Sequence, residues 1–159
     1  MAELLFETRE QFHTWLLEHC NASPGVWLVF GKGRQLRTLT AADALEEALC
    51  FGWIDGQMQK VDDTRYLKYF APRRPQSPWS EKNRKLAEAL IGQGRMMPEG
   101  LLKIQQAKAD GRWAVPKRAP ISEEQVAELT RLLEGQEQAL HHFSGMSPSV
   151  KRQYTGLYF

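Results

Sequence analysis

The chain has 159 residues, of which 42% are hydrophobic and 25% are charged, and its formal net charge is +2. One hydrophobic core is the norm at this length, and the composition excludes a disordered, collagen-like or strongly polyionic protein. The opening segment MAELLFETREQF has early acidic residues and no long apolar run. We therefore expect neither a secretory signal nor membrane insertion, and a cytoplasmic location.

The first two elements in chain order are a helix and a buried strand. Thr8 and Gln11 have the spacing of a capping box, and apolar residues then recur at helical intervals up to a helix end near Asn21. The run VWLVF at 26–30 is short, rich in β-formers and bounded by turn residues, so it predicts a buried strand.

A second helix and a hairpin are expected next. Thr40 can cap a helix over residues 41–49, and Gly52 ends that helix. Residues 54–61 and 65–70 then favour two strands joined by a short polar turn. The first half of the chain is therefore expected to run α-β-α-β-β.

The second half is predicted to be mainly helical. Three prolines in APRRPQSPW, residues 71–79, remove backbone donors and predict a loop. A basic helix follows from Ser80, and GQGRMMPEG separates it from a shorter helix around 101–109. Residues 116–120 are expected to be a linker, and a capping box at Ser122 then begins a helix that one or two short helices follow.

These elements predict an α+β fold, in which a small antiparallel or mixed sheet of about three strands packs with several helices, and the C-terminal half is helical. The expected organisation is an α+β core at 1–115 followed by a linker and C-terminal helices at 116–159. We expect the two parts to form one compact domain.

Positive charge is concentrated in the middle third of the chain. Residues 71–118 contain eleven Lys or Arg and four Asp or Glu. One interpretation is a module that binds nucleic acid or an acidic protein through this segment. In the alternative interpretation the same charges are simply solvated on the outer faces of helices.

The strongest local signal for binding is the loop-to-helix junction PRRPQSPWSEKN. A helix N-terminus presents unpaired N–H groups to anions, and Arg73 and Arg74 lie just upstream with planar guanidinium groups suited to carboxylate or phosphate. The serines could add hydroxyl donors, and the tryptophan could stack on a flat ligand. Equally, the serine could only cap the helix, with the tryptophan buried and the arginines solvated or ion-paired.

Asp55 is the candidate catalytic residue, and whether the chain is an enzyme stays open. It lies in GWIDG between two glycines and beside aromatic residues. Such a carboxylate could act as a general base or pair with an arginine of the PRRP segment, or it could accept N–H groups within its own turn. The candidate ligand-binding residues are Trp53, Asp55, Arg73, Arg74, Ser77, Trp79, Ser80, Asn83, Arg95 and Arg112.

No metal or cofactor is expected. Cys20 and Cys50 each lie among apolar residues, which favours two small buried side chains over a redox or metal role. The four histidines lack the spacing of metal ligands, and no phosphate-binding or dinucleotide-binding fingerprint is present. A homo-oligomer is compatible with the sequence.

Four ordered motifs resemble a known family. The segments ALCFGWIDGQ, FAPRRPQSPWSEKN, GRM at 94–96 and AKADGRW at 107–113, with SPGVWLVFGK upstream, are similar to the YdeI/OmpD-associated family, also called the bacteriocin-protection family. The similarity spans roughly residues 12–113, and SGMSPSVKRQY at 144–154 resembles the family's C-terminal segment.

The resemblance implies a small bacterial or archaeal protein, associated by name with outer-membrane porins and with resistance to bacteriocins or antimicrobial peptides, and without an established reaction. Similar proteins usually continue past the KRQY-like stretch into a helix with a basic AK…TR…R pattern. This chain stops at TGLYF, which leaves open whether its C-terminus is native or truncated.

Three functions therefore compete. The first is an anionic small molecule bound in a pocket of Trp, Asp and Arg side chains, and the second is the nucleic-acid or acidic-protein module. The third is a stress- or envelope-protection protein that acts through a protein partner, for which an exposed apolar patch on the last helices would be evidence. We take the first as the working hypothesis, because clustered Trp, Asp and Arg at turns are a costly way merely to build a fold.

Overall fold

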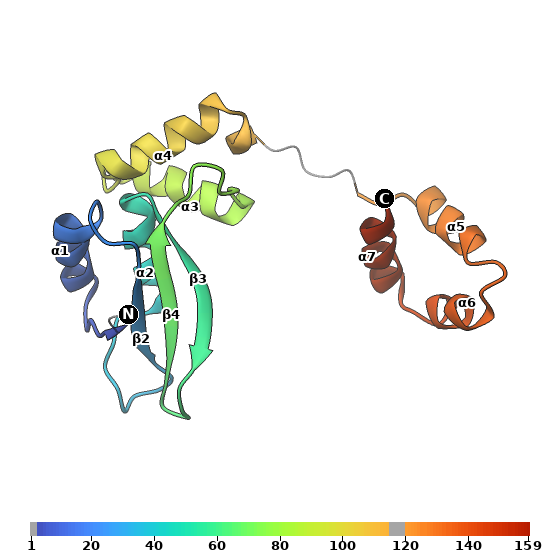
Figure 1. Ribbon diagram of the computed structural model, residues 1–159, viewed down its shortest axis with the longest axis horizontal. Coiled ribbons are helices and arrows are strands. Elements are labelled where there is room, and N and C mark those ends of the chain that lie inside the picture. The colour runs from blue at the N-terminus through green and yellow to red at the C-terminus, as the bar shows by residue number, and fades with distance from the viewer. Residues whose placement is uncertain (1–2, 115–119) are drawn as a thin grey trace. The chain divides into compact units, whose positions relative to one another are not determined.

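The computed structural model describes residues 3–114 and 120–159, and the chain divides into two compact units, Met1–Val115 and Pro116–Phe159. The first unit contains β1 (Glu3–Leu4), α1 (Arg9–His19), β2 (Val26–Gly31), α2 (Ala41–Cys50), β3 (Trp53–Lys60), β4 (Arg65–Pro72), α3 (Glu81–Gly92), α4 (Pro98–Ala109) and the 3₁₀ helix η1 (Arg112–Ala114) (Figure 1). The second contains α5 (Glu123–Leu132), α6 (Glu137–Ser144) and α7 (Pro148–Tyr158). None of the described helices combines the length and the apolar character that crossing a bilayer requires.

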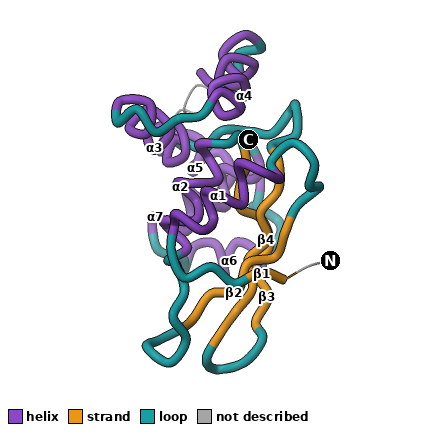
Figure 2. Tube along the Cα trace, turned by 90° about the vertical axis from the view of Figure 1, so that its left-hand side faces the viewer, coloured by secondary structure: helices purple, strands orange, loops and turns teal. Residues whose placement is uncertain are grey.

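The α+β class is confirmed, with a mixed four-stranded sheet in the order β1-β2-β4-β3. β1 is parallel to β2, and the other neighbours are antiparallel. Helices α1 and α2 lie over one face of the sheet, while α3 and α4 lie beyond one end of it (Figures 1 and 2). The two-residue β1 was not expected, since it is too short to show an alternating pattern.

The core of the first unit lies between the sheet and α1 and α2. Phe12 and Leu16 of α1 are fully buried, as are Leu28 of β2 and Phe70 of β4. Phe12 and Phe70 meet edge to face, with ring centroids 5.8 Å apart. Each such side chain contributes roughly 1.5–3 kcal/mol by leaving water, so this layer supplies much of the stability that holds the loops at the sheet end in place.

Gly52 makes the turn between α2 and β3, and because it has no side chain, α4 can pack directly against this turn. Its φ of 72° lies in the left-handed region, which glycine adopts at little cost. A Cβ at this position would lie 2.7 Å from Cγ of Lys103 and 2.9 Å from the backbone oxygen of Glu99. The FGW turn is therefore tight because a second helix is packed directly on its backbone.

Local signals placed most helix starts correctly. Thr8 and Ser122 both form the expected capping boxes, and Thr40 and Ser80 cap α2 and α3 through their side chains. α4, however, begins at Pro98 rather than near residue 101. The reason is that a proline at the first position of a helix loses no hydrogen bond.

The expected loop from Ala71 is also shifted, because β4 continues through Pro72. The pairing of β4 with β2 ends at Phe70, whereas its pairing with β3 continues to Pro72 opposite Trp53. The missing N–H of Pro72 faces the side on which β2 has already ended, so no ladder bond is lost. The expected linker at 116–120 lies outside the described residues except for Pro120.

The second unit is a small helical unit with its own apolar groove. Leu129, Phe143 and Thr155 are buried, one from each helix. Arg152 of α7 and Glu123 of α5 form an ion pair at 2.5 Å. The groove, of about 450 Å³, is lined mainly by apolar side chains of all three helices, which matches the apolar patch considered for the C-terminal helices.

Replacing Gly52 by alanine is expected to destabilise the protein by about 1–3 kcal/mol, because alanine combines a strained φ with a clash against α4. Chemical denaturation followed by circular dichroism measures the change. Gly92→Ala is the matched control, since a Cβ at Gly92 meets nothing within 4 Å. An equal loss of stability in both variants would contradict the packing of Gly52 against α4.

Candidate functional site

Arg73 follows β4 directly and is buried under the loop that leads to α3. Only 3% of the residue is exposed. Its Nη1 donates to Ser77 Oγ at 3.3 Å and to the Pro78 backbone oxygen at 3.0 Å. The guanidinium carbon lies 3.7 Å from the centre of the Trp79 ring, which is a close cation–π contact.

The remaining donors of Arg73 are not satisfied. Nε and Nη2 are both buried and have no hydrogen-bond partner, and no carboxylate in the described parts of the chain lies within ion-pair distance of Arg73. The pKa of Arg73 is lowered to about 10. Desolvation is the main cause and the charge of Arg112 adds to it, whereas the charge of Asp55 opposes both. Arg73 is thus a buried cation at neutral pH whose charge is only partly compensated.

Arg112 of η1 holds the same loop from the other side. Its Nη1 donates to the Ser77 backbone oxygen at 2.8 Å, and its Nη2 lies 2.6 Å from Asp110 Oδ2. The neighbouring Trp113 packs on Trp79 with ring centroids 5.0 Å apart. The loop of residues 73–80, which we call the PRRP loop, is therefore held by its own Arg73 and Trp79 and, from η1, by Arg112 and Trp113.

Asp55 lies in β3 opposite Phe70 rather than in a turn. Its Oδ2 is 2.5 Å from Nζ of Lys68, and its charge raises the pKa of Arg73. Because Lys68 already occupies this carboxylate, the arrangement favours an electrostatic role for Asp55 over proton abstraction. Lys68 was missed in the sequence, although a lysine between Tyr66 and Phe70 at an inward-facing strand position was a signal.

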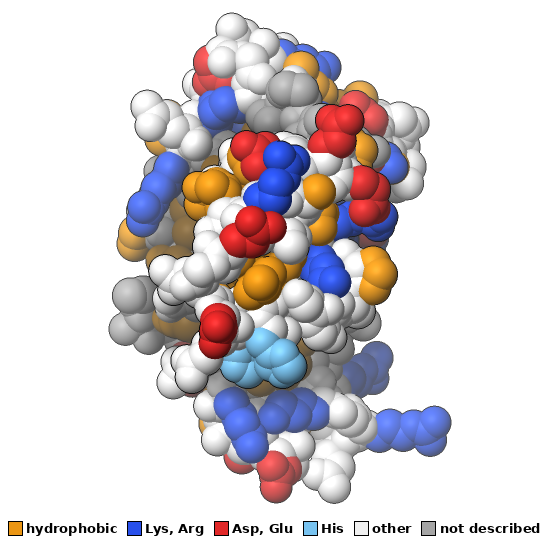
Figure 3. All heavy atoms as spheres, turned by 90° about the vertical axis from the view of Figure 1, so that its right-hand side faces the viewer, with side chains coloured by type: hydrophobic (Ala, Val, Ile, Leu, Met, Phe, Trp, Pro, Cys, Tyr) orange, Lys and Arg blue, Asp and Glu red, His pale blue; other side chains and the backbone are white. Residues whose placement is uncertain are grey.

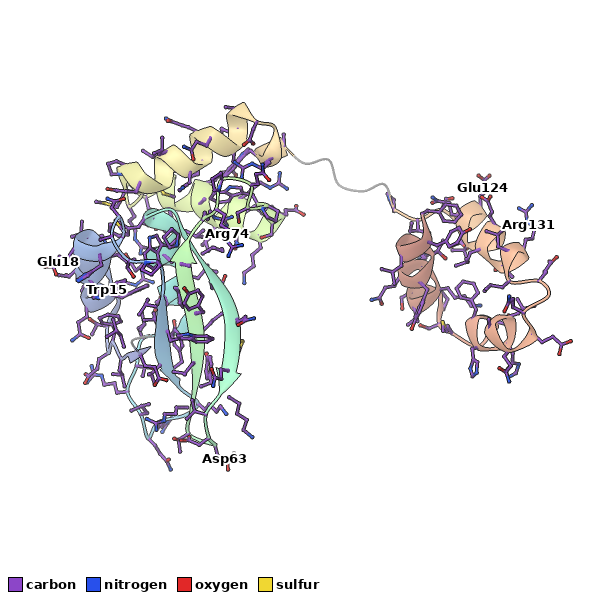
Figure 4. All side chains as sticks on the ribbon, viewed as in Figure 1. Trp15, Glu18, Asp63, Arg74, Glu124 and Arg131 are labelled. Atoms are coloured by element: carbon purple, nitrogen blue, oxygen red, sulfur yellow. The ribbon has the colours of Figure 1, made fainter. Side chains whose placement is uncertain are left out.

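The ten expected site residues do not all meet. The structure brings Asp55, Arg73, Ser77, Trp79 and Arg112 together. Trp53 belongs to the core, is 1% exposed, and donates from Nε1 to the Cys20 backbone oxygen at 3.1 Å. Ser80 accepts from the Asn83 backbone N–H at 3.1 Å as the cap of α3. Arg74 is exposed in the loop between β4 and α3 (Figure 4).

Arg95 lies in a separate ionic cluster around Glu47. Nη2 of Arg95 is 2.5 Å from Glu47 Oε1, and Nη1 is 3.0 Å from Glu46 Oε2. His13 Nδ1 lies 2.9 Å from Glu47 Oε2. Arg9, which begins α1, pairs with both Glu46 and Glu47 of α2. Since only 5% of the Glu47 side chain is exposed, this cluster joins α1, α2 and the α3–α4 connection as an internal crosslink.

Neither cysteine is suited to nucleophilic chemistry. Cys20 and Cys50 are both buried and free. Burial raises the pKa of the Cys50 thiol to about 11, and burial together with Glu99 raises the pKa of Cys20. Within residues 3–114 and 120–159, no three His, Cys, Asp or Glu side chains are grouped so that they could hold a metal ion.

Changing Glu47 to glutamine is expected to lower the free energy of unfolding by about 1.5–3 kcal/mol, because it removes a charged acceptor from Arg95, Arg9 and His13 at once. Urea titration measures the loss. Glu46→Gln is the matched control and should cost less, since its side chain is 28% exposed. A loss for Glu46→Gln equal to or larger than that for Glu47→Gln would contradict the central place of Glu47.

Comparison with known proteins gives a family but no activity. A family model described as a domain of unknown function, DUF8412, matches residues 4–103, a segment that includes the sheet and the PRRP loop. No curated protein matches the chain, and no solved structure does. The resemblance to the YdeI/OmpD-associated family therefore stays a prediction. By the extent of the match, the chain belongs to the DUF8412 family.

Proposed function

We propose that this protein binds an anionic small molecule, a carboxylate or a phosphate, through Arg73, Ser77 and Arg112, which together we name the Arg73 site. The observation that carries the proposal is the buried guanidinium of Arg73, two of whose donors meet no hydrogen-bond acceptor among the described residues. A buried polar group without a partner costs about 1–3 kcal/mol, and a charged group costs more. An anion that met these donors would offset that cost.

The two unpartnered donors of Arg73, Nε and Nη2, are also the pair that can bind one anion together. Nε and Nη2 lie along one edge of the planar guanidinium group, and this edge forms two parallel hydrogen bonds to a carboxylate or phosphate. Nη1, on the other edge, is already used by Ser77 and Pro78. The protein thus holds one edge of Arg73 and leaves the bidentate edge unused.

The local charge favours an anion. Lys68, Arg73 and Arg112 lie near Asp55 and Asp110, so the positive side chains exceed the carboxylates by one. Trp79 covers the guanidinium face and lowers the effective dielectric constant around it. A monoanion bound here would be compensated without any further change in charge.

Binding has to be coupled to movement of the loop. Nε and Nη2 of Arg73 are sealed from solvent, so an anion reaches them only when residues 74–78 lift away. These residues contain no helix or strand, and they are held chiefly by contacts from Arg73 and Arg112. Such loops commonly close over a small ligand.

The alternative module for nucleic acid or an acidic protein receives less support. Several cations of the basic segment have internal partners: Lys85 pairs with Glu81, Arg84 donates to the Trp113 backbone oxygen, and Arg95 lies in the Glu47 cluster. On the face drawn in Figure 3, positive and negative side chains are mixed in the upper part, and Lys and Arg are more frequent in the lower part. The resistance to bacteriocins that the resemblance implies likewise stays a prediction.

Arg73→Gln should weaken anion binding by about tenfold or more, because it removes both the charge and the bidentate edge. Calorimetric titration with phosphate, a dicarboxylate and a nucleoside monophosphate measures the affinity. Arg74→Gln is the matched control, since it removes the same charge from an exposed neighbour and should change the affinity less than about twofold.

Two results would contradict the proposal. One is a wild-type protein that binds none of these anions, together with an Arg73→Gln variant of unchanged or higher stability, which would assign Arg73 to loop packing alone. The other is retention on heparin or single-stranded DNA that grows with ligand length and falls steeply with salt, as expected of a polyanion-binding surface.

A further inference from the structure

A second cavity lies beside the turn made by Gly52 and Trp53, and we name it the Gly52 cavity. Its volume is about 270 Å³. The chain after α1 lines it at Asn21, and α4 lines it at Glu99, Leu102 and Lys103. The side chains of Arg73, Ser77 and Arg112 are not among those that line it, so the Gly52 cavity is separate from the Arg73 site.

Two opposite charges in this cavity are left without partners. Glu99 and Lys103 are four residues apart on α4, a spacing at which glutamate and lysine ordinarily pair on a helix surface. Across the described residues, neither forms an ion pair with the other or with a third side chain. Glu99 lines the cavity together with Cys20, and burial together with the charge of Glu99 raises the pKa of the Cys20 thiol.

Gly52 determines where Lys103 can lie. A Cβ at Gly52 would be 2.7 Å from Cγ of Lys103, so the aliphatic part of the lysine rests on the glycine backbone. Lys103 is therefore half-buried, and it lines the cavity beside Gly52. Leu102 gives the cavity most of its exposed apolar surface, while Phe51 and Trp53 line it from within the core.

We propose that the Gly52 cavity binds a small zwitterion with an apolar side group, in the manner of a free apolar amino acid. Glu99 accepts hydrogen bonds from the ligand's ammonium group, Lys103 donates to its carboxylate, and the side group packs against Leu102, which is 53% exposed. The cavity is slightly smaller than the roughly 300–1,000 Å³ of sites for drug-sized ligands, which fits a ligand of this size.

The ligand series tests the need for both charges. Calorimetry or ligand-observed NMR compares L-leucine with 3-methylbutylamine, which lacks the carboxylate, and with 4-methylpentanoate, which lacks the ammonium group. We expect leucine to bind, and each singly charged analogue to bind about tenfold more weakly or worse. Equal binding of all three would overturn the zwitterion proposal, as would no binding of leucine or other apolar amino acids at millimolar concentration.

The variants test the two roles separately. Glu99→Gln should weaken leucine but leave 4-methylpentanoate unchanged, and Lys103→Gln should weaken leucine but leave 3-methylbutylamine unchanged. Lys108→Gln, which removes a charge elsewhere on α4, is the matched control and should leave leucine binding intact. Unchanged leucine binding in both cavity variants would overturn the proposal.

Asn21→Trp keeps the test informative if Lys103→Gln unfolds. Asn21 is exposed at the rim, so a tryptophan there should block the cavity without removing either charge or any core contact. Leucine binding that survives this variant would overturn the assignment. Arg73→Gln should leave leucine binding unchanged, so a failure at the Arg73 site and a failure at the Gly52 cavity give different results.

Discussion

The close approach of α4 to the turn at Gly52 is the constraint on which the rest of the first unit depends. Only Phe51 and Gly52 separate the end of α2 from the start of β3, and Gly52 makes this short turn possible because it can take a positive φ. α4 also carries a glycine at the contact, Gly100, where a Cβ would lie 2.4 Å from the Cys50 backbone oxygen. That same oxygen accepts the Met97 backbone N–H at 3.0 Å, so the helix is both packed and hydrogen-bonded onto the end of α2.

Both candidate sites are built from this junction. The backbone oxygen of Gly52 accepts the Arg73 backbone N–H at 2.9 Å, which fixes where β4 ends and where the buried guanidinium begins. The missing side chain of Gly52 admits Lys103, which forms one wall of the Gly52 cavity. A single backbone turn thus positions a cation on the strand side and two oppositely charged residues, Glu99 and Lys103, on the helix side.

Three arginines of the first unit lie in two different environments. Arg9 and Arg95 are each paired with the glutamates of α2, and the central carboxylate of Glu47 is almost fully buried. Arg73 is more deeply buried than either, yet an aromatic face, a hydroxyl and a carbonyl are its only close partners in the described structure. Arg73 therefore differs from Arg9 and Arg95, whose carboxylate partners come from α2.

The sequence by itself determined what local chemistry controls. Capping residues at Thr8, Thr40, Ser80 and Ser122 marked where helices begin, because a side-chain acceptor for free N–H groups is needed wherever the helix packs. A short apolar run of β-forming residues between turn residues likewise marked β2, and a polar turn marked the hairpin of β3 and β4. The sequence also showed that Arg73, Ser77 and Trp79 share one short loop.

Only the tertiary structure decided which side chains meet. Trp53 lies two residues from Asp55 on the same face of β3, yet it belongs to the core, because it packs on Trp15 of α1 and its indole N–H donates to the Cys20 backbone oxygen. Arg95 pairs with Glu46 and Glu47 instead of contacting the PRRP loop, and the register of β3 and β4 brings Asp55 next to Lys68. Pairings of this kind depend on long-range packing and on register, which no spacing along the chain encodes, whereas caps and turns are satisfied within a few residues.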